Sequence, residues 1–405
     1  MLLTRLAYGG EAIGRLEDGR AVFVPFGLPG ERVRIRLTEE KRGFARGELV
    51  EILEPSPYRI VPRCKHFGIC GGCHYQNLLY EEQLKSKMEI LRDQFTRIGR
   101  IENPPVQDIV ASPNPWNYRN HVQFHVTEEG KLGYVGAGTS FAKGIIPITE
   151  CHLPEASINS LWPQLEFEPE TNLDRVSLRA GRDNDLMLVL ESDSAESPEL
   201  EIEADISVAQ VFEENTVVIA GNDHIVIPVL GREFYVSAAS FFQVNTALAE
   251  KMVHCLLTCL PLSLSSTLLD VYCGVGLFSA FVAPKCERLI GIEASSSACE
   301  DFAINLDEFD NVELYEGLAE EVIPHLEAKP DIVLVDPPRA GLEKRVVDGI
   351  LELRPQVIAY VSCDPSTLAR DSKRLIEGGY ELKQVTPLDL FPQTYHIESI
   401  SIFEQ

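Results

Sequence analysis

The N-terminal segment alternates apolar and polar residues in short runs. Between residues 21 and 53, the runs AVFVPF, ERVRIRL and GELVEIL are separated by turn signals at residues 27–30 and 41–43. Alternation with a period of two is typical of half-buried strands and predicts a small β-barrel over residues 1–54. A generic all-β module would show the same pattern. Outward-facing basic side chains favour a nucleic-acid-binding barrel, namely Arg32, Arg34, Arg36, Lys41, Arg42 and Arg46.

The middle of the chain begins with a helical pattern and continues as strands. Between residues 80 and 98, Leu84, Met88, Leu91 and Phe95 recur at helical spacing. From residue 106 to residue 231, short apolar runs such as HVQFHV, LMLVLE and HIVIPVL predict an antiparallel sheet. We therefore expect a central domain over residues 55–231.

The last part of the chain alternates apolar strands with helical segments. The strand candidates are TLLDVYC, RLIGIEA, VELYEG, DIVLVDPP and VIAYVSCDP. This alternation predicts an α/β domain with a doubly wound parallel sheet over residues 232–405. Two final strands, in YELKQVTPLDLF and HIESISIFEQ, have no helix between them. We expect them to form a hairpin at one edge, with at least one strand antiparallel.

Composition and charge narrow the class of protein. The chain has 405 residues, 45% hydrophobic and 24% charged, and contains no apolar run of the roughly 18 residues that span a bilayer. Its first residues lack the apolar core of a signal peptide, so we expect a cytoplasmic protein. The net charge is -26, but residues 1–100 hold 17 Lys and Arg against 13 Asp and Glu. A polyanionic partner would therefore meet the N-terminal quarter.

A glycine turn and two carboxylates mark the predicted parallel sheet. Gly274 and Gly276 follow the strand in LLDVYCGVG, and Glu293 ends the next strand, where a carboxylate can bind ribose hydroxyls. Asp336 begins the DPPR turn after the strand IVLV. The G-x-G spacing lacks the third glycine of a dinucleotide site, and the DPP turn favours S-adenosylmethionine over NAD. A nucleotide fold without cofactor is the alternative.

Cys363 and Glu398 are the candidates for covalent chemistry. A lone cysteine is usually a small buried hydrophobe, but Cys363 ends a strand whose carboxyl end should face the same crevice as Asp336. If the last strand runs antiparallel beside it, Glu398 at that strand's start adjoins the thiol. A base would then lie beside a nucleophile; an ordinary edge-strand glutamate is the alternative.

A cysteine cluster precedes the predicted helix. Cys64, Cys70 and Cys73 can present three thiolates to one centre, and Cys151 is the best fourth ligand. Soft ligands select zinc or an iron-sulfur cluster, and His66, His74 and His152 keep zinc open. The ten cysteines of a cytosolic chain of this length are not expected to form disulfides.

The segment SFFQVN, residues 240–245, combines aromatic rings with side-chain amides. Phe241 and Phe242 fit either a hydrophobic core or a platform on which bases stack. Gln243 could add amide hydrogen bonds to the same site.

Taken together, these motifs resemble the S-adenosylmethionine-dependent RNA uracil-C5-methyltransferases, in the subgroup with an N-terminal TRAM barrel and a 4Fe-4S cluster. Six motifs carry the resemblance in the same order: C-x5-CGGC with a distant cysteine, FFQVN, DVYCGVG, DPPR, SCDP and FPQTYHIES. It covers nearly the whole chain and implies a class I, Rossmann-like methyltransferase domain. Leu277 and Gln393 depart from the family pattern, and the first puts one cofactor hydrogen bond in doubt.

The resemblance implies a role for each candidate. Cys363 would be the nucleophile and Glu398 the base. The cofactor or its surroundings would be contacted by Gln243, Tyr272, Gly274, Gly276, Glu293 and Asp336. The cluster would be held by Cys64, Cys70, Cys73 and Cys151. The chemistry agrees, because a thiolate adding at C6 of uracil activates C5, and a base must later remove the C5 proton.

We expect a monomeric enzyme whose partner is structured RNA, with 23S ribosomal RNA as the first candidate and transfer RNA as the second. A non-catalytic RNA-binding protein with a methyltransferase-like fold is a different-class alternative. A zinc-containing amino-group methyltransferase is a third.

Overall fold

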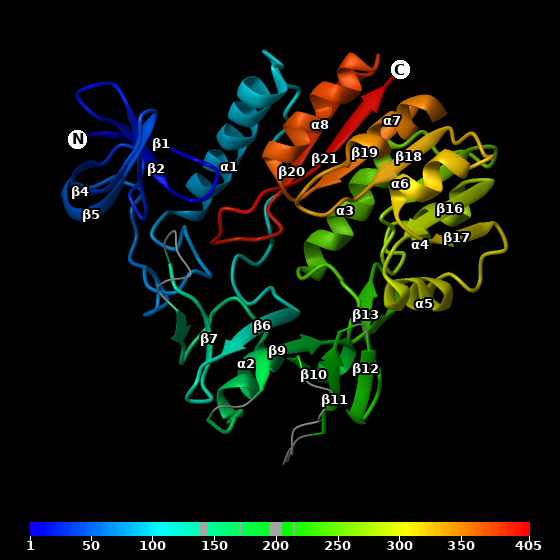
Figure 1. Cartoon of the computed structure of the whole chain (residues 1–405), viewed down its shortest axis with the longest axis horizontal. Coiled ribbons are helices and arrows are strands. Elements are labelled where there is room, and N and C mark those ends of the chain that lie inside the picture. Colours follow the sequence, from blue (N-terminus) through cyan, green and yellow to red (C-terminus); the bar gives the residue numbers. More distant parts are fainter. Residues whose placement is uncertain (138–143, 170–171, 194–204, 214) are drawn as a thin grey trace.

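The computed structural model describes residues 1–137, 144–169, 172–193, 205–213 and 215–405. Along the chain, a small barrel is followed by a seven-stranded sheet, a hairpin and a second seven-stranded sheet flanked by helices (Figure 1). No helix in these ranges is long and apolar enough to cross a membrane.

The N-terminal sheet has five strands in the order β1-β2-β3-β5-β4. Their bounds are β1 (Leu3–Leu6), β2 (Ala12–Arg15), β3 (Ala21–Val24), β4 (Arg32–Glu40) and β5 (Phe44–Glu54). Neighbours are antiparallel except β3 and β5, and a bridge between Leu2 and Arg32 joins the two edges. Alternate side chains such as Leu3, Val22 and Val33 fill the interior. The predicted barrel is confirmed.

The outward-facing basic residues of this barrel are less free than the sequence suggests. Along β4 and β5, Arg32, Arg34 and Arg36 pair with Glu54, Glu51 and Glu48. Lys41 pairs with Glu39, and Arg46 pairs with Glu11. The expected basic stripe is therefore largely neutralised by carboxylates on the adjoining strand. Exposed ion pairs of this kind contribute little to stability, so a phosphate could displace them at small cost.

A helix joins the barrel to the rest of the molecule. It comprises α1 (Tyr80–Gln94) and a π-helical turn, η1 (Phe95–Gly99), close to the predicted residues 80–98. Leu91 and Phe95 lie in the same hydrophobic cluster as residues of the last sheet.

The central sheet has the order β12-β11-β10-β9-β6-β7-β8. The strands are β6 (His121–Val126), β7 (Leu132–Val135), β8 (Ile145–Pro147), β9 (Leu173–Ala180), β10 (Leu186–Ser192), β11 (Ser207–Phe212) and β12 (Asn215–Ala220). Short helices flank it: α2 (Ala156–Leu161), η3 (Trp162–Gln164) and η4 (Arg182–Asn184).

The prediction of an antiparallel sheet is wrong at one pair. β10 and β11 are parallel, whereas the other neighbouring strands of the sheet are antiparallel. Parallel neighbours need a crossover connection instead of a tight hairpin. The connection here runs from residue 193 to residue 206, of which residues 194–204 lie outside the described part.

A separate two-stranded hairpin, β13 (His224–Val229) and β14 (Arg232–Ser237), leads to the last sheet. The expected boundary after residue 231 falls in its turn.

The last sheet has the order β17-β16-β15-β18-β19-β21-β20. Its strands are β15 (Thr267–Val271), β16 (Arg288–Glu293), β17 (Val312–Glu316), β18 (Ile332–Val335), β19 (Val357–Ser362), β20 (Glu381–Leu388) and β21 (Glu398–Glu404). β21 runs antiparallel to both β19 and β20, while β15 to β19 are parallel. The predicted parallel sheet with a terminal hairpin is confirmed.

Helices cover both faces of this sheet, as the predicted doubly wound fold requires. The helices are α3 (Thr246–Cys259), α4 (Ser279–Val282), η5 (Ala283–Lys285), α5 (Ser296–Asn305), α6 (Ala319–Val322), η6 (Ile323–His325), α7 (Lys344–Leu353) and α8 (Pro365–Glu377). Met252 of α3 and Phe302 of α5 pack on one face, whereas Val347 of α7 and Leu368 of α8 pack on the other.

Candidate active site

The strand order reverses between β15 and β18. From β15 the chain proceeds outward to β16 and β17, and then returns to β18 on the other side of β15. Ligands of open α/β sheets bind in the crevice at the carboxyl ends of the strands where such a reversal occurs. The glycine turn follows β15 and Asp336 follows β18, with the Asp336 N–H donating to the Val271 carbonyl at 3.2 Å. Both predicted elements therefore border this crevice.

Glu293 organises the glycine turn. Its Oε2 accepts a hydrogen bond from the Gly274 N–H at 2.9 Å, and its Oε1 accepts from the N–H groups of Ala294 and Ser295, each at 2.8 Å. Tyr272 begins the turn at a φ of 66°. The carboxylate thus ties the turn to the segment that enters α5.

The two glycines of the turn are constrained differently. A Cβ on Gly274 would meet no atom within 4 Å, so the space beside it is open to a ligand. A Cβ on Gly276 would come within 2.3 Å of Leu306 Cδ1 and 3.0 Å of Phe302 Cδ2. Packing against Phe302 and Leu306 is by itself enough to require glycine at residue 276. Gly274 is the glycine that a ligand can approach closely.

Two carboxyl groups adjoin the crevice, Asp336 half-buried and Asp270 fully buried. Burial raises the pKa of Asp336 to about 7, and burial together with the charges of Asp336 and Glu293 raises that of Asp270 to about 7. Ser279 Oγ donates to Asp270 Oδ2 at 2.6 Å, whereas Asp270 Oδ1 is buried without a hydrogen-bond partner. An unsatisfied buried oxygen at the foot of the turn suits a ligand that donates hydrogen bonds.

The register of the edge hairpin brings Cys363 and Glu398 together. Ser362 at the end of β19 is paired with Ser399 near the start of β21. This is the last pair of the two strands; Cys363 follows Ser362 and Glu398 precedes Ser399, so both lie at the same end of the ladder, and the charge of Glu398 acts on the Cys363 thiol. The predicted meeting of thiol and carboxyl is therefore present in the fold.

Burial dominates the electrostatics of this pair. The pKa of Cys363 is raised to about 12, mainly by burial and in addition by the nearby carboxylates of Glu398 and Asp336, while the Arg339 guanidinium opposes the shift. The pKa of Glu398 is well above its usual range because the group is buried and faces Asp336; Arg339 again opposes the shift. The thiol therefore needs a proton acceptor to react, and the carboxyl is a stronger base than a solvated glutamate.

The SFFQVN segment divides between core and surface. Phe242 is 6% exposed, and its ring centroid lies 5.7 Å from that of Phe234. It belongs to the core, so the prediction that it stacks on a base is wrong. Phe241 is 66% exposed. It borders a cavity of about 970 Å³ that also includes Arg179 and His121. Gln243 is buried, and its carbonyl accepts from Asn120 Nδ2 at 3.0 Å.

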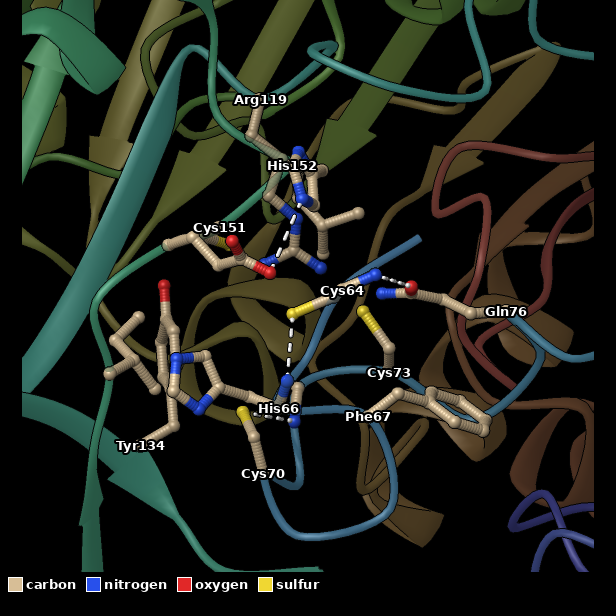
Figure 2. A pocket seen from close by; sticks show the side chains of 14 residues that line it. Cys64, His66, Phe67, Cys70, Cys73, Gln76, Arg119, Tyr134, Cys151 and His152 are labelled. Atoms are coloured by element: carbon tan, nitrogen blue, oxygen red, sulfur yellow. Dashed lines mark hydrogen bonds and ion pairs between the residues drawn. The ribbon is translucent and has the colours of Figure 1, made fainter. Parts of the chain in front are cut away.

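The four predicted ligand cysteines line one cavity of about 50 Å³. Figure 2 shows Cys64, Cys70, Cys73 and Cys151 around it. The pKa of Cys70 is raised to about 11 and that of Cys73 to about 12, mainly by burial and in part by neighbouring thiols. Two thiols accept backbone N–H groups: His66 donates to Cys64 Sγ and Gly72 to Cys70 Sγ, both at 3.4 Å.

The donor set at this cavity does not fit a single metal ion. Within the described ranges, no three Cys, His, Asp or Glu side chains form a group that could hold one ion. His66 lines the cavity, but its Nε2 accepts the Thr149 N–H at 3.0 Å, and His152 lies near Glu150. His74 is not among the lining residues; its ring contacts Tyr395 at 4.6 Å. Expectations of zinc through these histidines gain no support.

Three residues that the structure brings to the site have no distinctive signal in the sequence. Arg339 is part of the DPPR turn, and its charge acts on both Cys363 and Glu398. Asp270 was part of the strand LLDV, where a lone polar residue in a buried strand is the available signal. Tyr8 comes from the barrel, and its hydroxyl donates to Asp364 Oδ2 at 2.8 Å, next to Cys363.

A doubly wound sheet with a glycine turn, Glu293 and Asp336 around its switch point has the architecture of the S-adenosylmethionine-dependent methyltransferases. Residues 208–405 match the tRNA (Uracil-5-)-methyltransferase family model, and residues 2–50 match the TRAM domain. The chain belongs to the S-adenosylmethionine-dependent RNA uracil-5-methyltransferase family.

Individual proteins resemble the whole chain. An uncharacterized RNA methyltransferase of Thermosynechococcus vestitus is 34% identical, over 98% of this chain and 96% of its own. One from Bacillus cereus is also 34% identical, over 98% of this chain and 94% of its own. The crystal structure of the tRNA (uracil-54, C5)-methyltransferase of Pyrococcus abyssi, in complex with S-adenosyl-L-homocysteine, has a TM-score of 0.76 at 25% identity. It covers 100% of this chain and 99% of its own. The protein is thus an RNA methyltransferase, as the resemblance implied.

Proposed function

We propose that this enzyme methylates C5 of a specific uridine in structured RNA through a covalent bond between Cys363 and C6 of the base. The observation that supports the proposal is the end of the β19–β21 ladder, where Cys363 and Glu398 adjoin the last pair and the charges of Glu398 and Asp336 both act on the thiol. Few arrangements other than covalent base chemistry require a half-buried thiol and a buried carboxyl at the same strand ends.

The roles of the two groups follow from the reactivity of uracil. C5 is a poor nucleophile until the Cys363 thiolate adds at C6 and places negative charge on the ring. S-adenosylmethionine, when bound, supplies the methyl group as a sulfonium. After transfer, C5 holds both methyl and hydrogen; Glu398 removes that proton and the thiolate is expelled from C6. The raised pKa of Glu398 suits it to accept the proton.

The residues present fit the cofactor. Open space beside Gly274 and the unpartnered Asp270 Oδ1 are the features that a bound ligand would explain. We propose that the cofactor is contacted by Gln243, Tyr272, Gly274, Glu293 and Asp336, with Gly276 supporting the turn. We propose Phe241 as the stacking surface for RNA, because its ring is exposed at the rim of a large cavity.

We propose further that Cys64, Cys70, Cys73 and Cys151 hold a 4Fe-4S cluster. The four thiols share one cavity, and the N–H···S bonds to Cys64 and Cys70 would stabilise thiolate ligands. A cluster is several ångströms wide and therefore needs ligands spaced further apart than a single ion does. Since methyl transfer moves no electrons, the cluster would act in structure or RNA binding.

The RNA target is proposed in order of preference. 23S ribosomal RNA is the first candidate, on the combination of barrel and cysteine cluster. Transfer RNA is the second, and the whole-chain similarity to a tRNA (uracil-54, C5)-methyltransferase favours it specifically. We also propose the division into residues 1–54, 55–231 and 232–405, working as a monomer.

The test is methylation with labelled S-adenosylmethionine of separate 23S ribosomal and transfer RNA transcripts, followed by nucleoside analysis. We expect label in 5-methyluridine from one RNA class, lost by about 10⁴-fold or more in Cys363→Ala and retained in the matched Cys255→Ala. Label in a methylated purine, or activity that survives Cys363→Ala, would contradict the thiolate mechanism. No label in any RNA would support a binding protein instead.

A further inference from the structure

Two contacts connect the N-terminal barrel with the edge of the sheet that holds Cys363 and Glu398. One is a hydrogen bond from Tyr8, in the turn between β1 and β2, to Asp364. The other is hydrophobic and involves Ile397, the residue before Glu398. In Figure 1 the segment that leads into β21 extends from the sheet towards the barrel.

The first contact reaches the residue next to the thiol. Asp364 Oδ1 accepts the N–H groups of Ser366 and Thr367 at 2.9 and 3.0 Å and so caps α8. Its Oδ2 accepts the Tyr8 hydroxyl at 2.8 Å. Each oxygen of the carboxylate therefore has a fixed direction, and the hydroxyl from the barrel determines one of them.

The turn that carries Cys363 is short and pinned on both sides. Ser362 Oγ donates to the Asp364 carbonyl at 3.0 Å and lies 3.2 Å from the Asp364 N–H. Cys363 lies between these two residues, so a displacement of the Asp364 backbone moves the thiol. Removal of the Tyr8 hydroxyl would release one of the constraints on that displacement.

The second contact reaches the residue next to the carboxyl. Ile397 is 1% exposed and belongs to the hydrophobic cluster formed by the barrel residues Leu3, Val24 and Leu28 together with Ile90 of α1. Tyr395 lies edge-on to Tyr8, with ring centroids 5.5 Å apart. The residue before β21 therefore belongs to the cluster that joins the barrel to α1, and Glu398 follows it directly.

We propose, building on the function proposed above, that the barrel positions both reacting side chains, Cys363 through Tyr8 and Glu398 through Ile397. The barrel then completes the methylation site as well as contacting RNA. Tyr8 and Ile397 are positioning residues, since neither is placed to touch the reacting atoms. Misplacement by about 1 Å can cost a reaction about 10²-fold, so loss of one contact should be measurable in the chemical step.

The test uses the full-length enzyme and RNA that contains 5-fluorouridine at the target position. Fluorine at C5 cannot leave as the proton does, so the covalent complex persists and its rate of formation can be followed on a denaturing gel. The variant is Tyr8→Phe, which removes only the hydroxyl. Tyr235→Phe is the matched control, because Tyr235 also donates to an aspartate, Asp223, at 2.8 Å. RNA affinity is measured for each protein in a Cys363→Ala background.

We expect Tyr8→Phe to slow adduct formation and kcat about tenfold or more, the scale of a lost hydrogen bond to a charged group. RNA affinity should stay within about twofold, and Tyr235→Phe should behave as wild type. An unchanged adduct rate in Tyr8→Phe, or a loss of RNA affinity as large as the loss of rate, would overturn the proposal. If the wild-type enzyme forms no adduct at all, the proposed function itself fails, and this coupling with it.

Ile397→Ala tests the second contact. Adduct should form at a near-normal rate with ordinary RNA but resolve more slowly, because Glu398 is displaced while Cys363 is not. Normal resolution in a folded Ile397→Ala protein would remove this half of the proposal. Should that variant fail to fold, Tyr8→Phe still decides whether the barrel positions the thiol.

Discussion

The catalytic edge and the cysteine-lined cavity both hold half-buried thiols. Burial is the main cause of the raised pKa in both, to about 12 for Cys363 and for Cys73. Their neighbours differ. Cys363 faces the carboxyl groups of Glu398 and Asp336, whereas Cys73 faces Cys151 and Cys70. The two thiols thus have similarly raised pKa values but different neighbours. The neighbouring groups decide which chemistry each thiol can support.

A thiol beside proton acceptors can react, and thiols beside one another can share a centre. At the catalytic edge, the groups around Cys363 can take up a proton and return it. At the cavity, further thiols and backbone N–H donors suit thiolates neutralised by a bound cation. Each variant described next changes one of the two regions and leaves the other intact.

The largest effect should come from Glu398→Gln at the catalytic edge. The amide has nearly the same shape but cannot accept the C5 proton, so turnover should fall by about 10²- to 10⁴-fold. Because Cys363 is retained, the methylated adduct with ordinary RNA should accumulate and be visible on a denaturing gel. Glu404→Gln, at the exposed far end of the same strand, is the control. Loss of turnover without trapped adduct would show that Glu398 acts before methyl transfer.

A different response is expected from Cys73→Ala in the cavity. Purified anaerobically, this variant should lose bound iron and visible absorbance, and its thermal midpoint should fall by about 2–4 °C for each kcal/mol of lost stability. Methylation of a protein that remains folded should fall less than tenfold, because the reaction moves no electrons. Cys255→Ala controls for the loss of a half-buried thiol. Wild-type protein without iron would contradict the cluster.

The smallest effect should follow Arg339→Gln. The guanidinium lowers the pKa of Cys363, so its removal raises that pKa and reduces the thiolate fraction at neutral pH. Since Arg339 is exposed, solvent screens its charge, and we expect a loss of no more than about tenfold in adduct rate. Raising the pH should recover the rate. Arg345→Gln, at an exposed residue of α7, should leave the rate unchanged. An equal loss of rate at every pH in Arg339→Gln would argue against a charge effect.

Local patterns were enough to predict most of the last sheet and its site. Each apolar strand ended at a residue with chemistry, as at Glu293, Asp336 and Cys363, and the carboxyl ends of parallel strands lie at one edge. The absence of a helix between the last two strands predicted the antiparallel hairpin. The antiparallel direction of the last strand also predicted that Cys363 and Glu398 lie at the same strand ends, because Ser362 and Ser399 beside them form the last pair of the ladder.

Features that depend on distant packing were not accessible in the same way. Phe241 and Phe242 are adjacent residues of the same type. Packing against Phe234 buries the ring of Phe242, and no local pattern distinguishes it from Phe241. The carboxylates opposite Arg34 and Arg36 depend on the exact pairing of β4 with β5, which includes several register shifts. Tyr8 reaches Asp364 from the opposite end of the chain, and no local pattern predicts such a contact.

The central claim is that Cys363 bonds to the target base, and mass spectrometry tests it most directly. The wild-type enzyme would be incubated with S-adenosylmethionine and RNA that contains 5-fluorouridine, and the covalent complex digested to peptides. We predict a single modified peptide, with the nucleotide attached at Cys363. Attachment at any other residue, or methylation of ordinary RNA by an enzyme that never forms the adduct, would contradict the account.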